Sequence, residues 1–76
     1  MKEKVREILQ KESFYEGELT PELLLNETLG IDSLRIVNVL LELEETFGIL
    51  IGEEDMEPKK LMYVQDIYDL AERYVS

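Results

Sequence analysis

The segment Ser33–Phe47, SLRIVNVLLELEETF, is the longest part of the chain with an unbroken helical periodicity. At about 100° per residue, one narrow arc of such a helix carries Ile36, Leu40, Leu43 and Phe47, flanked by Val39. Asp32 precedes the segment as a favoured N-cap residue, and Gly48 follows it where helices commonly end. The segment therefore predicts a helix from Ser33 to about Phe47 with a core-facing apolar stripe.

Two other segments have helical spacing. Residues 2–13 place Val5, Ile8 and Leu9 on one face, with Phe14 as a further candidate for it, and residues 64–74 repeat Val64, Ile67, Ala71 and Tyr74 with Leu70 beside them. Pro58 indicates a short helix through Lys59, Lys60 and Leu61. Between the first two helices, residues 15–31 contain two glycines, a proline and an asparagine, which are typical of a loop.

The sequence therefore predicts an all-α fold without strand-like alternation. We expect a small four-helix bundle, made of three longer helices plus one short helix, with a long loop between the first and second helices. A chain of 76 residues has room for one domain, so residues 1–76 are expected to form a single domain. We also expect this domain to be a monomer.

The charge of the chain restricts its partners. Acidic residues outnumber basic residues 18 to 8, and the net charge of −10 repels nucleic acid and anionic lipid. The sequence lacks cysteine and histidine, which removes the commonest metal ligands and general base. No apolar run is long enough for a signal peptide or a membrane span, so we expect a cytoplasmic protein without membrane insertion.

Apolar residues also occur on the face of the 33–47 helix that should meet solvent. Leu34, Val37 and Leu41 form a connected strip there, which we call the outer strip, and Asp32, Glu44 and Glu45 border it. An apolar surface with a charged rim is typical of a docking surface. Its acidic rim predicts partners with basic docking surfaces.

Ser33 stands at the start of the outer strip. Asp32 and Ser33 are both favoured N-cap residues, and either one could bind the free amides of the first turn. Asp32 can cap the helix by itself, which would leave the Ser33 hydroxyl exposed at the helix N-terminus.

The segment LGIDSLRIVNVLLELEETFG resembles the modification segment of acyl carrier proteins, in which Gly-x-Asp-Ser-Leu opens the second helix. The length, the order of helices and the acidic charge are similar to that family over essentially the whole chain. The resemblance implies that Ser33 carries a covalent 4′-phosphopantetheine arm, transferred from coenzyme A by a phosphopantetheinyl transferase. Acyl or aminoacyl groups would then travel as thioesters on the arm between acyl-loading and acyl-transferring enzymes, and the protein itself would not be an enzyme.

Carried over by position, the resemblance implies docking roles for Asp32, Leu34, Arg35, Val37, Leu41, Glu44 and Glu45. Two positions depart from carriers of fatty acid biosynthesis, because Arg35 stands where an acid is usual and Asn38 replaces a usual glutamate. These departures favour a carrier for polyketide, peptide or other specialised biosynthesis over ordinary fatty acid biosynthesis.

Three other interpretations remain open on the sequence alone. The outer strip could bind a partner protein without any modification of Ser33. The acidic run Glu53, Glu54, Asp55 and Glu57 could bind calcium, although it lacks the ligand spacing of an EF-hand. Ser33 could act as a nucleophile with Asp32 as base, although no histidine is present to complete such a site. We expect neither a catalytic nor a metal site.

Overall fold

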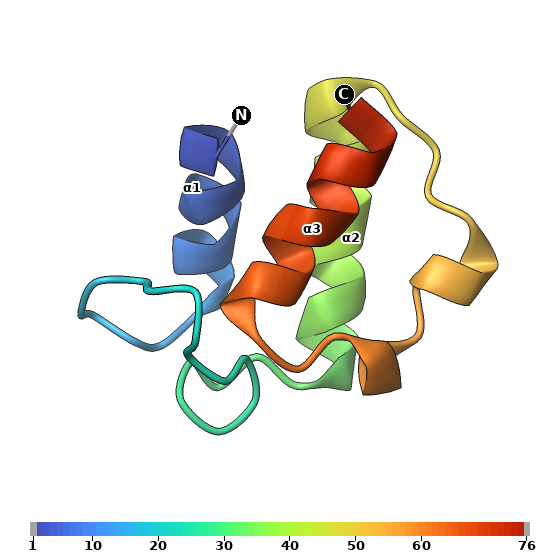
Figure 1. Ribbon diagram of the computed structural model, residues 1–76. Coiled ribbons are helices and arrows are strands. Elements are labelled where there is room, and N and C mark those ends of the chain that lie inside the picture. The colour runs from blue at the N-terminus through green and yellow to red at the C-terminus, as the bar shows by residue number, and fades with distance from the viewer. Residues whose placement is uncertain (1, 76) are drawn as a thin grey trace.

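Three α-helices form the fold of residues 2–75, which are the residues that the computed structural model describes (Figure 1). They are α1 (Lys2–Glu12), α2 (Ser33–Phe47) and α3 (Val64–Val75), with the single-turn 3-10 helices η1 (Glu53–Asp55) and η2 (Pro58–Lys60) between α2 and α3. Within the described residues there is no strand, only an isolated bridge between Leu24 and Tyr63. The prediction of an all-helical protein with three longer helices is confirmed, and η2 lies where the short helix was expected.

The ends of α2 lie where its sequence predicts them. The helix begins at Ser33 with Asp32 as N-cap and ends at Phe47, before Gly48. Gly48 has φ of 64° and ψ of 41°, a left-handed conformation that glycine adopts without the steric cost of a Cβ atom. Its amide donates to the carbonyl of Glu44, which satisfies one of the free carbonyl groups of the last turn.

Phe14 does not belong to the apolar face of α1, contrary to our expectation. The helix ends at Glu12, and the Phe14 amide donates to the carbonyl of Leu29 at 2.9 Å instead of continuing the helix. The Phe14 side chain is 71% exposed. This backbone bond to the long loop turns the chain away from the helix axis and leaves the ring outside the core.

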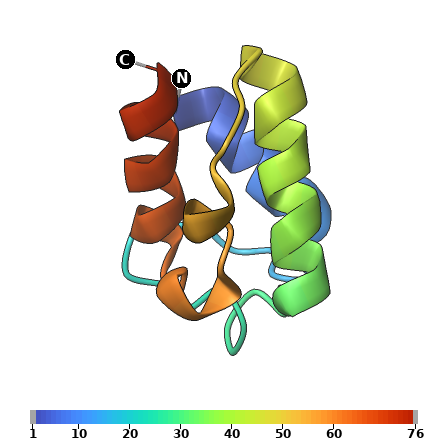
Figure 2. The same cartoon turned by 90° about the vertical axis from the view of Figure 1, so that its right-hand side faces the viewer.

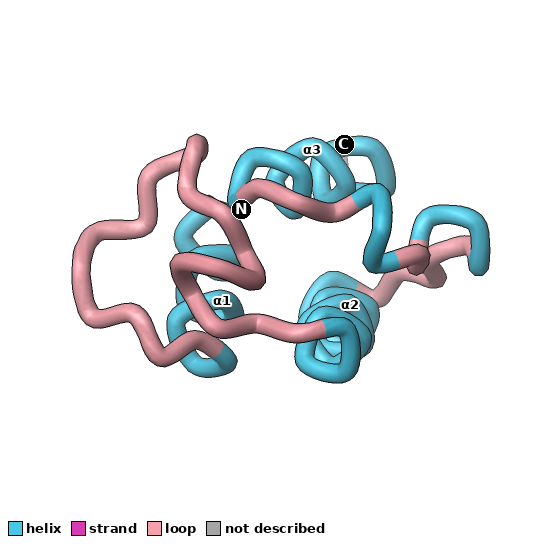
Figure 3. The backbone as a smooth tube through the Cα atoms, turned by 90° about the horizontal axis from the view of Figure 1, so that it is seen from below, coloured by secondary structure: helices cyan, strands magenta, loops and turns pink. Residues whose placement is uncertain are grey.

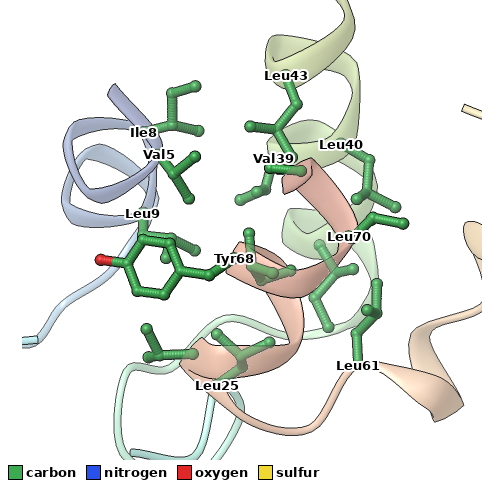
Figure 4. Close-up of a cluster of buried hydrophobic side chains, with 14 of the residues drawn as sticks. Val5, Ile8, Leu9, Leu25, Val39, Leu40, Leu43, Leu61, Tyr68 and Leu70 are labelled. Carbon is green, nitrogen blue, oxygen red and sulfur yellow. The ribbon is translucent and has the colours of Figure 1, made fainter. Parts of the chain in front are cut away.

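All three helices contribute side chains to one apolar core (Figure 4). The predicted stripe of α2 faces inward, with Ile36, Val39, Leu40 and Leu43 buried and Phe47 half-buried against the cluster. Figure 4 shows Val5, Ile8 and Leu9 of α1 on the opposite side of the core from Leu40, and Leu70 of α3 beside Leu40. The burial of these side chains is the main favourable term that holds the helices together.

Residues 13–32 form an ordered loop that passes below the helices (Figure 3). Four buried side chains, those of Leu19, Leu25, Leu29 and Ile31, anchor it in the core. Its backbone also pairs with the chain before α3, since the Leu25 amide donates to the Met62 carbonyl at 2.8 Å and the Val64 amide donates to the Leu23 carbonyl at 3.0 Å. The segment that leads into α2 is therefore held from two sides.

The connector between α2 and α3, residues 48–63, contains η1 and η2 and passes along the outer side of these two helices, on the side that faces the viewer in Figure 2. Buried Ile51 anchors its first part. Further along, the Tyr74 hydroxyl at the end of α3 donates to the Asp55 carboxylate in η1, and Arg73 lies 3.4 Å from the same carboxylate. The connector is therefore fastened to α3 before it reaches η2, which contacts α2.

Candidate functional site

Ser33 opens α2 at the end of the molecule opposite the start of α1 and the end of α3 (Figure 1). Two neighbours fix its position, because Ile31 is fully buried and Gly30 bends the chain with φ of 72°. Ser33 itself is exposed. The chain is thus anchored immediately before the serine, while the serine remains open to solvent.

Asp32 caps α2, as we expected. Its side chain accepts a hydrogen bond from the Arg35 amide at 2.9 Å, and its carbonyl accepts one from the Ile36 amide at 2.9 Å. The Ser33 hydroxyl is therefore not needed as a cap, and within residues 2–75 no hydrogen bond engages it. The amides of Ser33 and Leu34 lie in the first turn, where a helix offers no intrahelical acceptor.

The outer strip lies on the surface of α2. Leu34 is 73% exposed and Leu41 is 49% exposed, whereas Val37 is half-buried. The inner and outer faces of α2 are therefore those that the helical periodicity predicts. Glu45 is exposed beside the strip.

Glu44 has a structural contact that the sequence did not reveal. Its Oε2 atom accepts a hydrogen bond from the Ile51 amide at 2.8 Å, and the residue is half-buried. This bond links the last turn of α2 to the connector. Of the expected acidic pair, Glu45 is thus exposed and Glu44 is already engaged within the chain.

Arg35 points back to α1 and not simply into solvent. Its Nη1 atom donates to the Glu12 carbonyl at 3.2 Å and lies 3.9 Å from Glu12 Oε1. The guanidinium carbon lies 4.6 Å from the centre of the Phe14 ring. The charge of Arg35 is therefore partly balanced by Glu12, and the residue joins the end of α1 to the first turn of α2.

A cleft of about 380 Å³ lies beside Ser33, between the long loop, the start of α2 and η2. It is lined by Leu24, Asn26, Glu27, Ile31, Ser33, Ile36, Pro58, Lys59, Leu61 and Met62. Sequence analysis missed the cleft because its walls come from three segments that are far apart in the chain. The separate apolar residues of the loop and connector were the only signal.

The acidic run of the connector does not form a cation site in the described structure. Asp55 is engaged by Tyr74 and Arg73, and Glu57 lies 3.9 Å from Lys60. Among residues 2–75, no group of three or more acidic, histidine or cysteine side chains is placed to hold a metal ion. No helix of this part of the chain is both long enough and apolar enough to cross a membrane.

Comparison with known proteins shows to which family the chain is similar. Residues 3–72 match the family model described as phosphopantetheine attachment site. The chain is 38% identical to an acyl carrier protein of Buchnera aphidicola subsp. Baizongia pistaciae (strain Bp) over 76 residues, which cover 99% of this chain and 95% of that protein. It is 43% identical to an acyl carrier protein of Rubrobacter xylanophilus over 54 residues, which cover 71% of this chain and 64% of that protein. No solved structure matches the chain at a significant level.

The chain belongs to the phosphopantetheine attachment family, that of the acyl carrier proteins. Its cofactor is 4′-phosphopantetheine, and its role is that of a carrier. The first turn of α2 fits the phosphate of this group, because free amides and the positive end of the helix dipole favour an anion there. The bound group supplies a thiol, on which acyl groups are held as thioesters, to a chain that has no cysteine.

Proposed function

We propose that Ser33 is the residue to which 4′-phosphopantetheine is attached. One observation supports this proposal: Asp32 caps α2 by accepting a hydrogen bond from the Arg35 amide, while the adjacent Ser33 is exposed. The hydroxyl is thereby open to a transferase that carries coenzyme A. A phosphodiester formed there would lie next to the free amides of the first turn, which stabilise its negative charge.

The chain acts as a substrate and carrier for other enzymes and not as a catalyst. Among residues 2–75 no hydrogen bond joins the Ser33 hydroxyl to the carboxylate of Asp32, the nearest candidate base, and the sequence has no histidine that could activate this hydroxyl. We assign residues 1–76 to one carrier domain, a monomer in the cytoplasm, with η2 in the place of the short fourth helix of a bundle.

Docking is assigned to the start and outer face of α2. Asp32, Leu34, Val37, Leu41 and Glu45 offer an apolar surface with an acidic rim, which favours a partner with basic side chains. Glu44 contributes charge at the edge of this surface while it holds the connector. The partners are a phosphopantetheinyl transferase and the acyl-loading and acyl-transferring enzymes of a fatty acid, polyketide or other specialised pathway.

Arg35 and Asn38 indicate which kind of biosynthetic pathway the carrier serves. They make the first turns of α2 less negative than in carriers of fatty acid biosynthesis, which supports a specialised pathway. Glu12 partly neutralises the charge of Arg35. The reduced negative charge of these turns therefore comes from the absence of an acidic residue at position 35 as well as from the positive charge of Arg35.

Mass spectrometry of the intact protein tests the attachment. After incubation with coenzyme A, magnesium and a broad-specificity transferase, the wild type should gain one phosphopantetheinyl group, and Ser33→Ala should gain none. An unmodified interaction module would instead show no gain for the wild type. Such a result would remove the proposal.

A further inference from the structure

Phe14 is an exposed aromatic side chain that is nevertheless held in place. Its amide is bound to the Leu29 carbonyl at 2.9 Å, and its ring packs over Gly30. A Cβ atom at position 30 would lie 2.9 Å from Phe14 Cδ2, so the ring approaches the backbone as only glycine allows. On its other side the guanidinium of Arg35 lies 4.6 Å from the ring centre. We call Phe14, Gly30 and Arg35 the Phe14 platform.

The core gains little from this arrangement. The ring is 71% exposed, so it adds little to the apolar cluster that stabilises the fold. Aromatic and arginine side chains are enriched at protein interfaces, and a side chain that is ordered before binding loses less entropy when a partner covers it. An exposed ring fixed by its neighbours therefore has the properties of an interface residue.

Two residues of the Phe14 platform are close to Ser33 in the sequence. Gly30 precedes the serine by three residues, and Arg35 follows it by two. An interface of standard size covers about 800 Å² on each partner, roughly a sixth of the 4888 Å² surface of this protein. A transferase that reaches the Ser33 hydroxyl with a footprint of this size would extend from Ser33 over its immediate neighbours.

The charge around the ring indicates the chemistry of the partner. Residues 12–18, ESFYEGE, contain three glutamates and no basic residue. Glu12 balances Arg35, while Glu16, Glu18 and Asp32 are exposed. The complementary surface is an apolar pocket with a rim of lysine or arginine side chains.

We propose that Phe14 is a second docking point, outside α2, for the phosphopantetheinyl transferase that modifies Ser33, and that Gly30 and Arg35 are positioning residues for its ring. The inference rests on the proposed attachment at Ser33. The proposal requires that the transferase has a pocket that binds the Phe14 ring, in addition to a surface that contacts Leu34 and Leu41.

Steady-state kinetics of a broad-specificity transferase, with the carrier as the varied substrate, tests the proposal. Phe14→Ala should raise KM about tenfold with kcat nearly unchanged, as for the loss of one anchoring side chain. Leu50→Ala is the matched control, because Leu50 is 86% exposed on the connector, and its KM should equal that of the wild type. Circular dichroism and the thermal midpoint should be the same for all three proteins.

A double-mutant cycle tests the positioning role of Arg35. Arg35→Gln should raise KM severalfold in the wild type and should have little further effect in Phe14→Ala, because there is then no ring to hold. Equal KM values for the wild type and Phe14→Ala would overturn the docking point while leaving the attachment at Ser33 intact. A wild type that accepts no phosphopantetheine would overturn both proposals.

Discussion

At the scale of single residues, the site depends on which of two adjacent polar side chains caps α2. Both Asp32 and Ser33 have suitable oxygen atoms, and the Asp32 carboxylate takes the Arg35 amide at 2.9 Å. An ionised acceptor also interacts favourably with the positive end of the helix dipole. The Ser33 hydroxyl is consequently not needed to cap the helix.

Asp32→Ala should lower the free energy of unfolding by about 1 kcal/mol, because the Arg35 amide loses its acceptor at the helix start. Asp32→Asn should retain most of the stability, since an amide oxygen is also a good cap. Urea denaturation of the unmodified proteins measures both changes. Equal losses for the two variants would show that the charge of Asp32, and not its capping bond, is what stabilises the helix.

Tyr74 provides a pH-dependent test. The hydrogen bond to Asp55 raises the pKa of Tyr74 above its ordinary value of 10.0. Because the folded-state pKa is the higher one, the stabilisation is fully present below pH 10 and is lost as the pH rises through the folded-state pKa. Tyr74→Phe should therefore be less stable than the wild type at pH 7, and the difference should shrink above pH 10.

Denaturation curves of the unmodified wild type and Tyr74→Phe at several pH values check this prediction. The remaining tyrosines ionise in both proteins, so the difference between the two reports on Tyr74. A difference that grows above pH 10 would contradict the assigned cause of the pKa shift.

Sequence reasoning at this scale succeeded for local contacts and failed for distant ones. The capping bond of Asp32 spans three residues and follows from helix geometry. The contacts of Arg35 with Glu12 and Phe14 join residues that are 21 or more positions apart, so no spacing rule could indicate them. The backbone bond of Phe14 to Leu29, which removes this candidate from the apolar face of α1, was missed for the same reason. The contact of Glu44 with Ile51 is shorter in sequence, but it was missed because it crosses the end of the helix.

At the scale of elements, α2 has two apolar faces, one that packs in the core and one that is exposed to solvent. The inner face includes Leu40, which is fully buried, and the outer face includes Leu41, which is 49% exposed. The two adjacent leucines therefore form a matched pair for mutagenesis.

Leu40→Ala should lower the free energy of unfolding by about 2–5 kcal/mol, because it removes buried methyl groups and leaves a cavity. Leu41→Glu should change it by only about 0.5 kcal/mol, as is usual for a surface position, and should instead slow transfer of the arm. Thermal denaturation and the rate of modification separate the two effects. A Leu41→Glu variant that unfolds would contradict the assignment of the outer face.

The bounds of the helices could be predicted well because their end signals are local. Asp32 and Gly48 mark both ends of α2, and Pro58 opens η2. The element η1 was not predicted, since Glu53–Asp55 has no apolar periodicity and no side-chain cap. Its position depends on Tyr74 and Arg73 of α3, which are distant in the sequence.

At the scale of the whole molecule, the charge of −10 acts on partners more than on the fold. Transfer of the arm by a transferase with a basic docking surface should slow as salt rises, because screening weakens the attraction that steers the encounter. Measuring kcat/KM from low salt to about 0.5 M should show a clear decline, as the Debye length falls well below 10 Å. A flat profile would mean that apolar contacts alone govern docking.

The cleft beside Ser33 is a property of the whole fold and lay beyond sequence analysis. Its walls meet because the loop pairs with the segment before α3 and because the connector is fastened to α3 by Asp55. Residue patterns report the local structure on which such contacts depend, but not which segments come together.

The central claim is that one exposed hydroxyl receives the phosphopantetheine arm. The chain has three serines, Ser13, Ser33 and Ser76, so fragment mass spectrometry of the modified protein can locate the group directly. The account predicts the added mass only on the fragment that contains Ser33, with complete modification of that fragment at long reaction times. Added mass on another fragment, or an unmodified Ser33 fragment after exhaustive reaction, would contradict it.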